Sequence, residues 1–298
     1  MMQNDISVLQ KLKNRAKSKK IPFQLVLQLF CQEEFLRRLS ISPYRDKLIL
    51  KGGLFIFSYN GFEGRPTMDI DFLAKQITND HEAMKRAVET IMMQETGNDY
   101  IKFTIKSIEN IAEQKAYHGV RVKMITTISN TKTPFDIDIG IGDVIIPSEN
   151  ELEIPTQLEG FVHPKILSYS LESTIAEKLE AIFSRMETTS RMKDYYDIFY
   201  LAKNQCFDGN LLTEAIKQTF KIRGTVCDYD SLKRISVINL NEDMGKRWQM
   251  FTEKTLNMNI EFQEVVELII KFVEMPIQAI QEDTFLEQNW SEEFGWHI

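Results

Sequence analysis

The sequence has few cysteines, no long apolar run and no excess of basic residues, and each absence excludes a class of protein. Its three cysteines are odd in number and widely spaced, which excludes a disulfide framework and the usual zinc patterns. No stretch reaches the roughly 18 uninterrupted apolar residues of a membrane-spanning helix. The basic residues 11–20 and the apolar residues 21–30 are followed by no cleavage site of the secretory kind. We therefore expect a cytoplasmic protein that does not bind a membrane.

The charge balance excludes a wholly basic nucleic-acid binder. The chain has 36 basic and 43 acidic side chains, a net charge of −7, although a local basic patch remains compatible with this total. A content of 43% hydrophobic and 27% charged residues is typical of a globular protein, not of a disordered chain, a collagen or a coiled-coil rod. At roughly 100–200 residues per domain, the 298 residues indicate two domains, or one with a helical extension.

The pattern of apolar residues predicts an α+β protein with its strands in the first half. The first 50 residues have a helical period, and the region after Pro164 is again mainly helical. The elements expected between them are strands at 48–50, 70–73, 101–108, 120–128 and 135–146, and a helix at 81–93. We place the domain boundary after residue 155. Residues 1–155 then form a core with N-terminal helices, and residues 156–298 a mainly α-helical domain.

The segment Arg65-Pro66-Thr67-Met68-Asp69-Ile70-Asp71-Phe72 is the most informative for chemistry. In an extended strand Asp69 and Asp71 project to one side, while the apolar residues between and after them pack on the other. Two carboxylates roughly 6–7 Å apart repel each other unless a cation lies between them. Mg²⁺ or Mn²⁺ prefers such oxygen ligands, with substrate phosphates completing the site. Taken alone, the motif is more typical of a solvated edge strand.

Two neighbouring features suit a nucleotide. Gly52-Gly53 lies where a buried strand turns into a helix, and backbone N–H groups at such a turn can approach phosphate oxygens. Arg65, just before the acids, can pair with Asp69 or hold a phosphate. An ordinary tight turn would have the same glycines.

A third carboxylate is expected from Phe135-Asp136-Ile137-Asp138-Ile139-Gly140, where the acids again share one face. On a strand beside the first pair, one of them would complete a three-carboxylate, two-metal site for phosphoryl transfer. We choose Asp138 as the metal ligand, with Asp136 as the alternative, and we assign Asp143 to a turn.

A second cluster is predicted on two amphipathic helices. Lys178 lies off the apolar stripe of the first, whereas Asp194 and Asp197 lie near the stripe of the second, where an unpaired charge is costly. These acids therefore need cationic partners. One interpretation is a structural ion-pair network. The other has Lys178 contacting nucleotide phosphates, with Asp194 orienting it or acting as a base.

In order and spacing, these segments resemble the AbiEii/AbiGii family of bacterial nucleotidyltransferase toxins, of which the mycobacterial MenT enzymes are relatives. The resemblance covers the chain to about Cys206. The segments that carry it are Leu50-Lys51-Gly52-Gly53-Leu54, Arg65-x-Thr67-x-Asp69-Ile70-Asp71-Phe72, Asp136-Ile137-Asp138-Ile139-Gly140, Ala176-Glu177-Lys178-Leu179-Glu180-Ala181 and Arg191-x-Lys193-Asp194-Tyr195-Tyr196-Asp197. Many nucleotidyltransferases have Gly-Ser at the phosphate turn. This chain has Gly52-Gly53, which leaves the contact to backbone amides.

The resemblance implies a polymerase β-like nucleotidyltransferase core followed by a helical domain, metal binding at Asp69 and Asp71, and functional roles for Lys178 and Asp194. The leading hypothesis is a toxin of a toxin–antitoxin or phage-defence system that transfers nucleotides from an NTP to RNA, at the 3′ end of tRNA, with a cognate antitoxin as partner. Six cations within residues 11–20 form either an RNA-docking patch or a solvated helix face.

Two other classes of function stay open. A nucleotidyltransferase acting on a small molecule or a protein hydroxyl would keep the carboxylates but need no basic patch. A non-catalytic protein would bind a partner, for example through Trp290, Phe294 and Trp296, although such aromatics more often pack on the protein's own surface.

Overall fold

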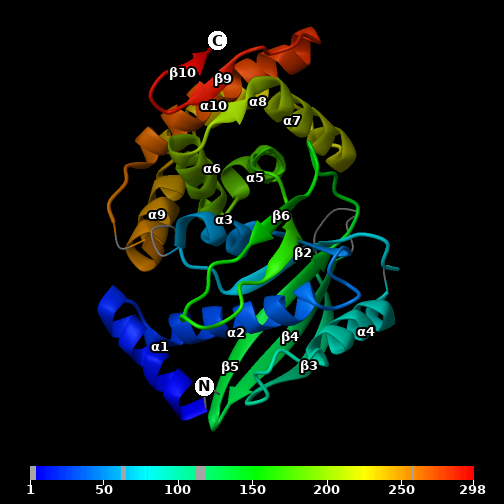
Figure 1. The fold of residues 1–298 in the computed structure, drawn as a ribbon. Coiled ribbons are helices and arrows are strands. Elements are labelled where there is room, and N and C mark those ends of the chain that lie inside the picture. The colour runs from blue at the N-terminus through cyan, green and yellow to red at the C-terminus, as the bar shows by residue number, and fades with distance from the viewer. Residues whose placement is uncertain (1–4, 62–64, 79, 112–118, 257) are drawn as a thin grey trace. The chain divides into compact units, whose positions relative to one another are not determined.

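The computed structural model describes residues 5–61, 65–78, 80–111, 119–256 and 258–298, and the chain divides into two compact units (Figure 1). Unit 1 consists of Met1–Gly142 and Asn150–Ser168, and unit 2 of Asp143–Glu149 and Tyr169–Ile298. The boundary placed after residue 155 falls inside the second segment of unit 1. The combination of a mixed sheet with many helices confirms the α+β class.

Unit 1 is built on a seven-stranded mixed sheet in the order β3-β4-β5-β2-β1-β7-β6. The strands are β1 Leu48–Lys51, β2 Asp69–Ala74, β3 Ile101–Ile111, β4 Gly119–Ile128, β5 Thr131–Gly140, β6 Asn150–Glu153 and β7 Lys165–Ser168. β2 runs parallel to β5 and antiparallel to β1. The two strands with paired acids are therefore direct neighbours.

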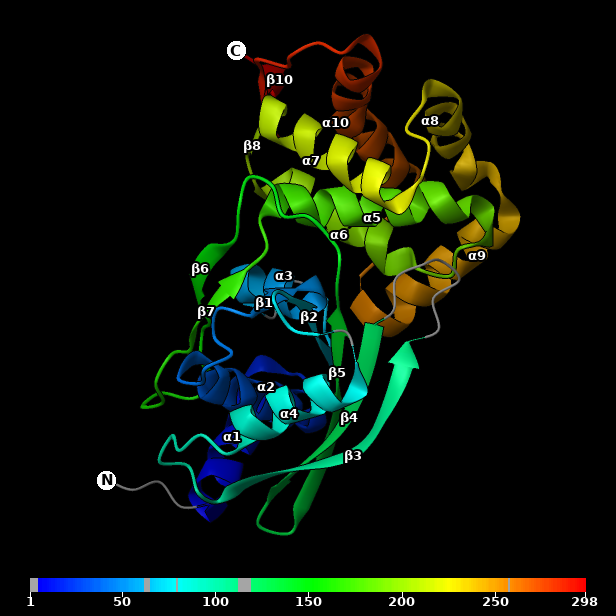
Figure 2. The same cartoon turned by 90° about the vertical axis from the view of Figure 1, so that its right-hand side faces the viewer.

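Helices cover one face of this sheet. They are α1 Asp5–Lys19, α2 Phe23–Ser40 and α4 His81–Met92, while α3 Gly52–Asn60 follows β1 directly. Phe35 of α2 contacts the rings of Phe72, Phe103 and Phe135, at centroid distances of 6.4, 6.0 and 6.4 Å. Figure 2 shows α2 and α4 on the same side of the long strands, with α1 packed beside α2. We call this the helical face.

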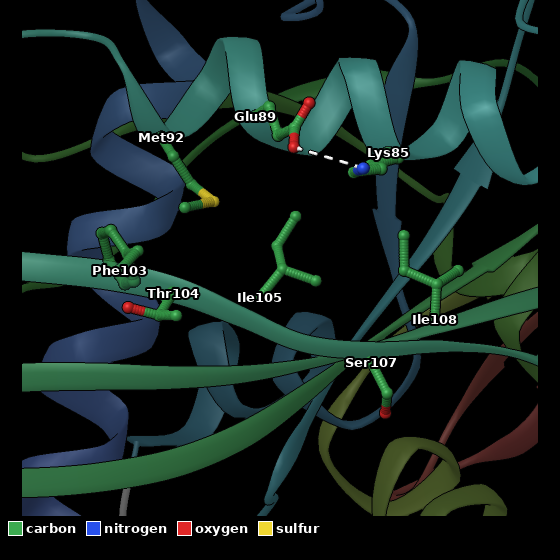
Figure 3. A pocket seen from close by; sticks show the side chains of 8 residues that line it. All are labelled: Lys85, Glu89, Met92, Phe103, Thr104, Ile105, Ser107 and Ile108. Carbon is green, nitrogen blue, oxygen red and sulfur yellow. Dashed lines mark ion pairs between the residues drawn. The ribbon is translucent and has the colours of Figure 1, made fainter.

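A groove of about 510 Å³ lies on the helical face, between α4 and β3. Figure 3 shows that Ile105 and Ile108 point from β3 toward α4, whereas Ser107 points away from it. The same alternation puts the acids of β2 and β5 on the opposite face, which we call the open face. The groove is thus separated from the predicted catalytic residues by the sheet itself.

Helix α2 is buried along most of its length although it contains four charged residues. Glu34 accepts hydrogen bonds from Arg37, Arg38 and, in the segment after α4, from Thr96 and Asn98. Glu33 accepts the backbone N–H of Gln157, and Arg37 donates to the carbonyl of Val162. Burial raises the pKa of Glu33 to about 8, against the attraction of Arg37. This network joins α2 to distant parts of unit 1.

Unit 2 is mainly helical, as predicted. Its elements are α5 Leu171–Arg185, α6 Met192–Asn204, β8 Phe207–Asp208, α7 Gly209–Arg223, α8 Tyr229–Ser236, α9 Glu242–Phe251, α10 Phe262–Glu282, β9 Asn289–Ser291 and β10 Gly295–His297. Asp143, expected in a turn, lies in an irregular connection and accepts a hydrogen bond from Arg223 of α7. In the described part of the chain, no helix is long and apolar enough to cross a membrane.

The C-terminal aromatics mostly pack on the protein itself, as expected. Trp290 is fully buried and donates its indole N–H to the carbonyl of Ala202 at 2.8 Å. Trp296 stacks on Phe272 at 6.0 Å, whereas Phe294 is 65% exposed. Packing of both tryptophans weakens the hypothesis of a partner-binding tail.

Candidate active site

Four carboxylates gather on the open face of β2 and β5. The parallel register places Asp69 beside Asp136 and Asp71 beside Asp138. Residues i and i+2 of one strand share a face, so the alignment of the two motifs puts all four side chains on the same side. The predicted adjacency of the two acidic segments is therefore found in the structure.

Three cations that no sequence motif singled out flank these acids. Lys123 lies opposite Asp136 across the β4–β5 pair. Lys51 lies opposite Asp71 across the β1–β2 pair, and Arg121 lies opposite Asp138 across the β4–β5 pair. Arg121 donates from Nε to Oδ1 of Asp138 at 2.7 Å and from Nη2 to Oδ2 at 2.6 Å. Its distance to Asp136 is 3.8 Å. Arg121 could have been found from the sequence, because it is a basic residue that alternates with the apolar Val120 and Val122 and so projects from the opposite face of the strand.

The acids hold more negative charge than Arg121 compensates. The pKa of Asp69 is raised, first by burial and then by repulsion from the other three carboxylates, while Arg121 opposes the shift. Burial likewise raises the pKa of Asp136, with attraction from Arg121 opposing it and repulsion from Asp138 adding to it. A bound cation would relieve this crowding.

The donor set fits a hard divalent cation whose coordination is completed by substrate. Among the described residues, no group of three acidic, histidine or cysteine side chains is arranged to hold a metal ion. Mg²⁺ commonly uses one or two carboxylates together with phosphates and water, which Asp69 and Asp71 can supply in part. Both oxygens of Asp138 are already engaged by Arg121. A complete three-carboxylate cage is not present in this arrangement.

The glycine turn lies directly against the acids. Gly52 has a φ of +69°, and a Cβ atom there would lie 2.0 Å from Oδ2 of Asp71. A Cβ atom at Gly53 would lie 2.6 Å from Oγ1 of Thr67 and 3.3 Å from Nη1 of Arg65. The N-terminus of α3, the guanidinium of Arg65 and the carboxylate of Asp71 therefore converge. This is an arrangement suited to a metal-bound polyphosphate.

We expect Gly52→Ala to lower nucleotide transfer by about 10²-fold, because displacement of a reacting group by about 1 Å has an effect of that order. The added methyl would force Asp71 to move. Gly245→Ala is the matched control, since a Cβ atom there meets nothing within 4 Å. Transfer rates of the two variants at matched folded fraction check this. Equal activity of Gly52→Ala and wild type would contradict it.

Two buried glutamines hold the start of β2. Gln28 and Gln32 of α2 both donate to the backbone carbonyl of Met68, the latter at 2.9 Å, and both are at most 2% exposed. Met68 immediately precedes Asp69. The α2 side chains thus fix the peptide from which the first acid projects. No pattern in the sequence indicates this role, because a buried glutamine in a helix looks the same as any polar residue that interrupts an apolar stripe.

Lys178 and Asp194 lie together in unit 2, in a buried cluster with Asp197 and Arg191. Lys178 Nζ lies 3.3 Å from Oδ1 of Asp194 and 2.5 Å from Oδ2 of Asp197. Arg191 Nε lies 2.7 Å from Oδ2 of Asp194. Burial raises the pKa of Asp194, but Lys178 and Arg191 together outweigh this and hold it below its usual range.

Lys178 was expected off the apolar stripe of its helix, but its side chain is buried. Lys178 is only 8% exposed, and both aspartates are 1% exposed. The long side chain reaches from α5 to α6 to neutralise acids that face the interior. The helical period of α5 alone could not show that α6 packs against this side chain.

We expect Arg121→Met to raise the affinity of the acidic cluster for Mn²⁺ by about tenfold or more, because a unit charge within about 5 Å contributes at least that much. The change frees both oxygens of Asp138. Lys85→Met is the matched control: it removes the same charge from α4 on the helical face, where Lys85 lies 3.9 Å from Glu89. Titration of free Mn²⁺ by electron paramagnetic resonance measures both. Equal affinities would contradict the prediction.

Comparison with known families supports one identification. The family model described as "Nucleotidyl transferase AbiEii toxin, Type IV TA system" matches residues 34–268, which include the four carboxylates of β2 and β5 and the two aspartates of α6. No curated protein matches the sequence.

Two solved structures are similar to this chain at low sequence identity. The nucleotidyltransferase toxin MenT4 (Rv2826c) from Mycobacterium tuberculosis H37Rv has a TM-score of 0.54 and 17% identity, with 95% of this chain and 99% of that chain covered. JHP933 from Helicobacter pylori has a TM-score of 0.48 and 15% identity, with 87% and 94% covered. The similarity to MenT4 confirms the expected nucleotidyltransferase toxin fold.

Proposed function

The chain belongs to the AbiEii family of nucleotidyltransferase toxins of type IV toxin–antitoxin systems, and on this basis we propose that it transfers nucleotides from an NTP to RNA, at the 3′ end of tRNA, with Mg²⁺ or Mn²⁺. The observation that carries the proposal is the convergence of Asp71 with the Gly52-Gly53 turn and Arg65. Membership of the family also implies an antitoxin partner. A role in phage defence is part of the proposal.

In the proposed reaction, Asp69 and Asp71 would hold the divalent cation, which when bound would supply positive charge to neutralise the triphosphate. The backbone N–H groups of the Gly52-Gly53 turn and the guanidinium of Arg65 hold phosphate oxygens. These groups position the nucleotide before any bond changes. Little else is required of the protein, because phosphoryl transfer depends mainly on positioning and on charge.

Asp136 is better placed than Asp138 to receive the proton of the acceptor hydroxyl. Both oxygens of Asp138 accept hydrogen bonds from Arg121, whereas Asp136 lies 3.8 Å from that guanidinium. The raised pKa of Asp136 makes its carboxylate the stronger base. Asp138 then keeps the role of positioning Arg121. This reverses the preference drawn from the sequence.

Lys178 and Asp194 keep the functional role that the family resemblance implies, as part of the proposal. Their burial and short ion pairs equally suit a scaffold that joins α5 and α6. The two interpretations give different melting temperatures and different activities on substitution, as described below.

The test is incubation of the purified protein with Mg²⁺, each labelled NTP in turn, and total RNA. Label on RNA is expected from the wild type and none from Asp69→Asn. Label on the protein or on a small molecule would favour the second class of nucleotidyltransferase. Absence of label from every fraction, with a folded protein and every NTP, would overturn the proposal.

A further inference from the structure

The open face continues from the acids into a stretch that contains lysines and no acids. Two cross-strand rows of β3, β4 and β5 make up this stretch. One row is Lys102, Thr127 and Lys132, and the next is Thr104, Ile125 and Pro134. The acids of the face belong to the two rows that follow. The first of these rows thus has cations and no acids, whereas the acid rows hold carboxylates together with Arg121 and Lys123.

These lysines are available for an anionic ligand. Lys102, Lys106 and Lys132 are exposed, and among the described residues none of the three forms an ion pair. Lys106 is the extra residue of a bulge between Ile105 and Ser107. Thr104 is exposed as well, and Thr127 is half-buried. We call Lys102, Thr104, Thr127 and Lys132, together with Lys106 beside them on β3, the lysine patch.

The lysine patch lies within reach of a strand of RNA bound at the acids. Lys132 precedes Asp136 by four residues on the same face of β5, a distance of about 13 Å along the strand at about 3.3 Å per residue. Lys102 lies in the row of Lys132, two strands away. A short single strand would span this distance in a few nucleotides.

We propose that the lysine patch binds the phosphates of the single-stranded end of the acceptor RNA, so that its terminal hydroxyl lies at the carboxylates. This inference rests on the proposed function. The two rows contain no aromatic side chain on which a base could stack. Contacts to phosphates position RNA without reading its sequence. The patch therefore sets the direction of the acceptor strand and not its sequence.

The basic residues of α1 are the competing surface. They are mostly exposed too, but α1 packs on α2, and α2 lies on the helical face (Figure 2). The acids lie on the open face. An RNA strand whose end is bound at Asp69 therefore passes over the lysine patch before it can reach α1, since the sheet separates the two surfaces.

The test compares two triple variants with the same change in charge. Lys102, Lys106 and Lys132 are replaced by glutamine in one, and Lys11, Lys17 and Lys19 in the other. Binding of a single-stranded RNA of roughly ten nucleotides is measured against salt concentration by fluorescence anisotropy. For the lysine patch we expect an affinity loss of about tenfold and a salt slope smaller by about 2, at about 0.7 per phosphate contact. The α1 variant should behave as wild type.

Replacing the same three patch lysines by arginine should preserve binding, which separates lost charge from lost fold. An unchanged salt slope in the patch variant, while the wild type still labels RNA from NTP, would overturn this inference and leave the proposed function intact. Loss of affinity in the α1 variant alone would overturn it as well. Failure of the wild type both to bind and to label RNA would overturn both proposals.

Discussion

Asp69→Asn is expected to reduce nucleotide transfer by about 10³-fold or more, since a catalytic metal provides several kcal/mol of charge stabilisation and about 1.4 kcal/mol corresponds to tenfold in rate. The fold should persist, because the change removes one of four crowded carboxylates. Transfer assays and thermal unfolding measure the two effects. Glu109→Gln is the matched control, as Glu109 lies on the open face but pairs with Lys123.

The sign of the pH dependence provides an independent check. Because the pKa of Asp69 is higher in the folded state than in the unfolded state, the folded state binds more protons between the two values. The wild type therefore loses stability as the pH rises through that interval, and Asp69→Asn should lose less. Added Mg²⁺ should reduce the loss in the wild type only. Near-normal toxicity of Asp69→Asn on induced expression would contradict the assignment.

Lys178→Met is expected to lower the free energy of unfolding of unit 2 by about 3–5 kcal/mol, because it removes a cation that neutralises two buried carboxylates. Asp194 would keep Arg191, but Asp197 would lose a partner at 2.5 Å. The melting temperature should fall by roughly 10 °C. Calorimetry or thermal circular dichroism measures this. A shift below about 2 °C would contradict the structural importance of the pair.

The double variant Lys178→Met/Asp197→Leu separates scaffold from chemistry. It removes one cation and one acid and leaves the Arg191–Asp194 pair intact, so most of the lost stability should return. If Lys178 serves the reaction, the double variant stays inactive although it is folded. A stable and active double variant would restrict Lys178 to a structural role.

The strands that could be predicted from the sequence were those with a local signal. β4 alternates buried and polar residues over its whole length, and its predicted bounds differ from the observed ones by one residue. β5 was expected at 135–146 but spans Thr131–Gly140. Pro134 lies inside β5. Since β2 begins opposite Asp136, Pro134 has a neighbouring strand on one side only, where a proline is tolerated. The short β6 and β7 gave no signal.

The candidate site divides in the same way. The common face of Asp69 and Asp71 follows from the two-residue period of a strand, which can be recognised from a short segment of sequence. The engagement of Asp138 by Arg121 and the reach of Lys178 to Asp197 depend on which strand or helix packs alongside. Which elements become neighbours depends on how the whole unit packs, and a pattern of a few residues holds no information about that packing.

The discontinuity of unit 1 has a consequence for synthesis of the protein. Asn150–Ser168 belongs to the unit that holds the acids, and it provides β7 beside β1 and the groups that satisfy Glu33 and Arg37. A chain on the ribosome that ends before this segment leaves buried charges of α2 unsatisfied, which disfavours a finished fold. The acids reach their working arrangement only once the polypeptide has been made past Ser168. Folding of the site that holds the acids is therefore delayed until late in translation.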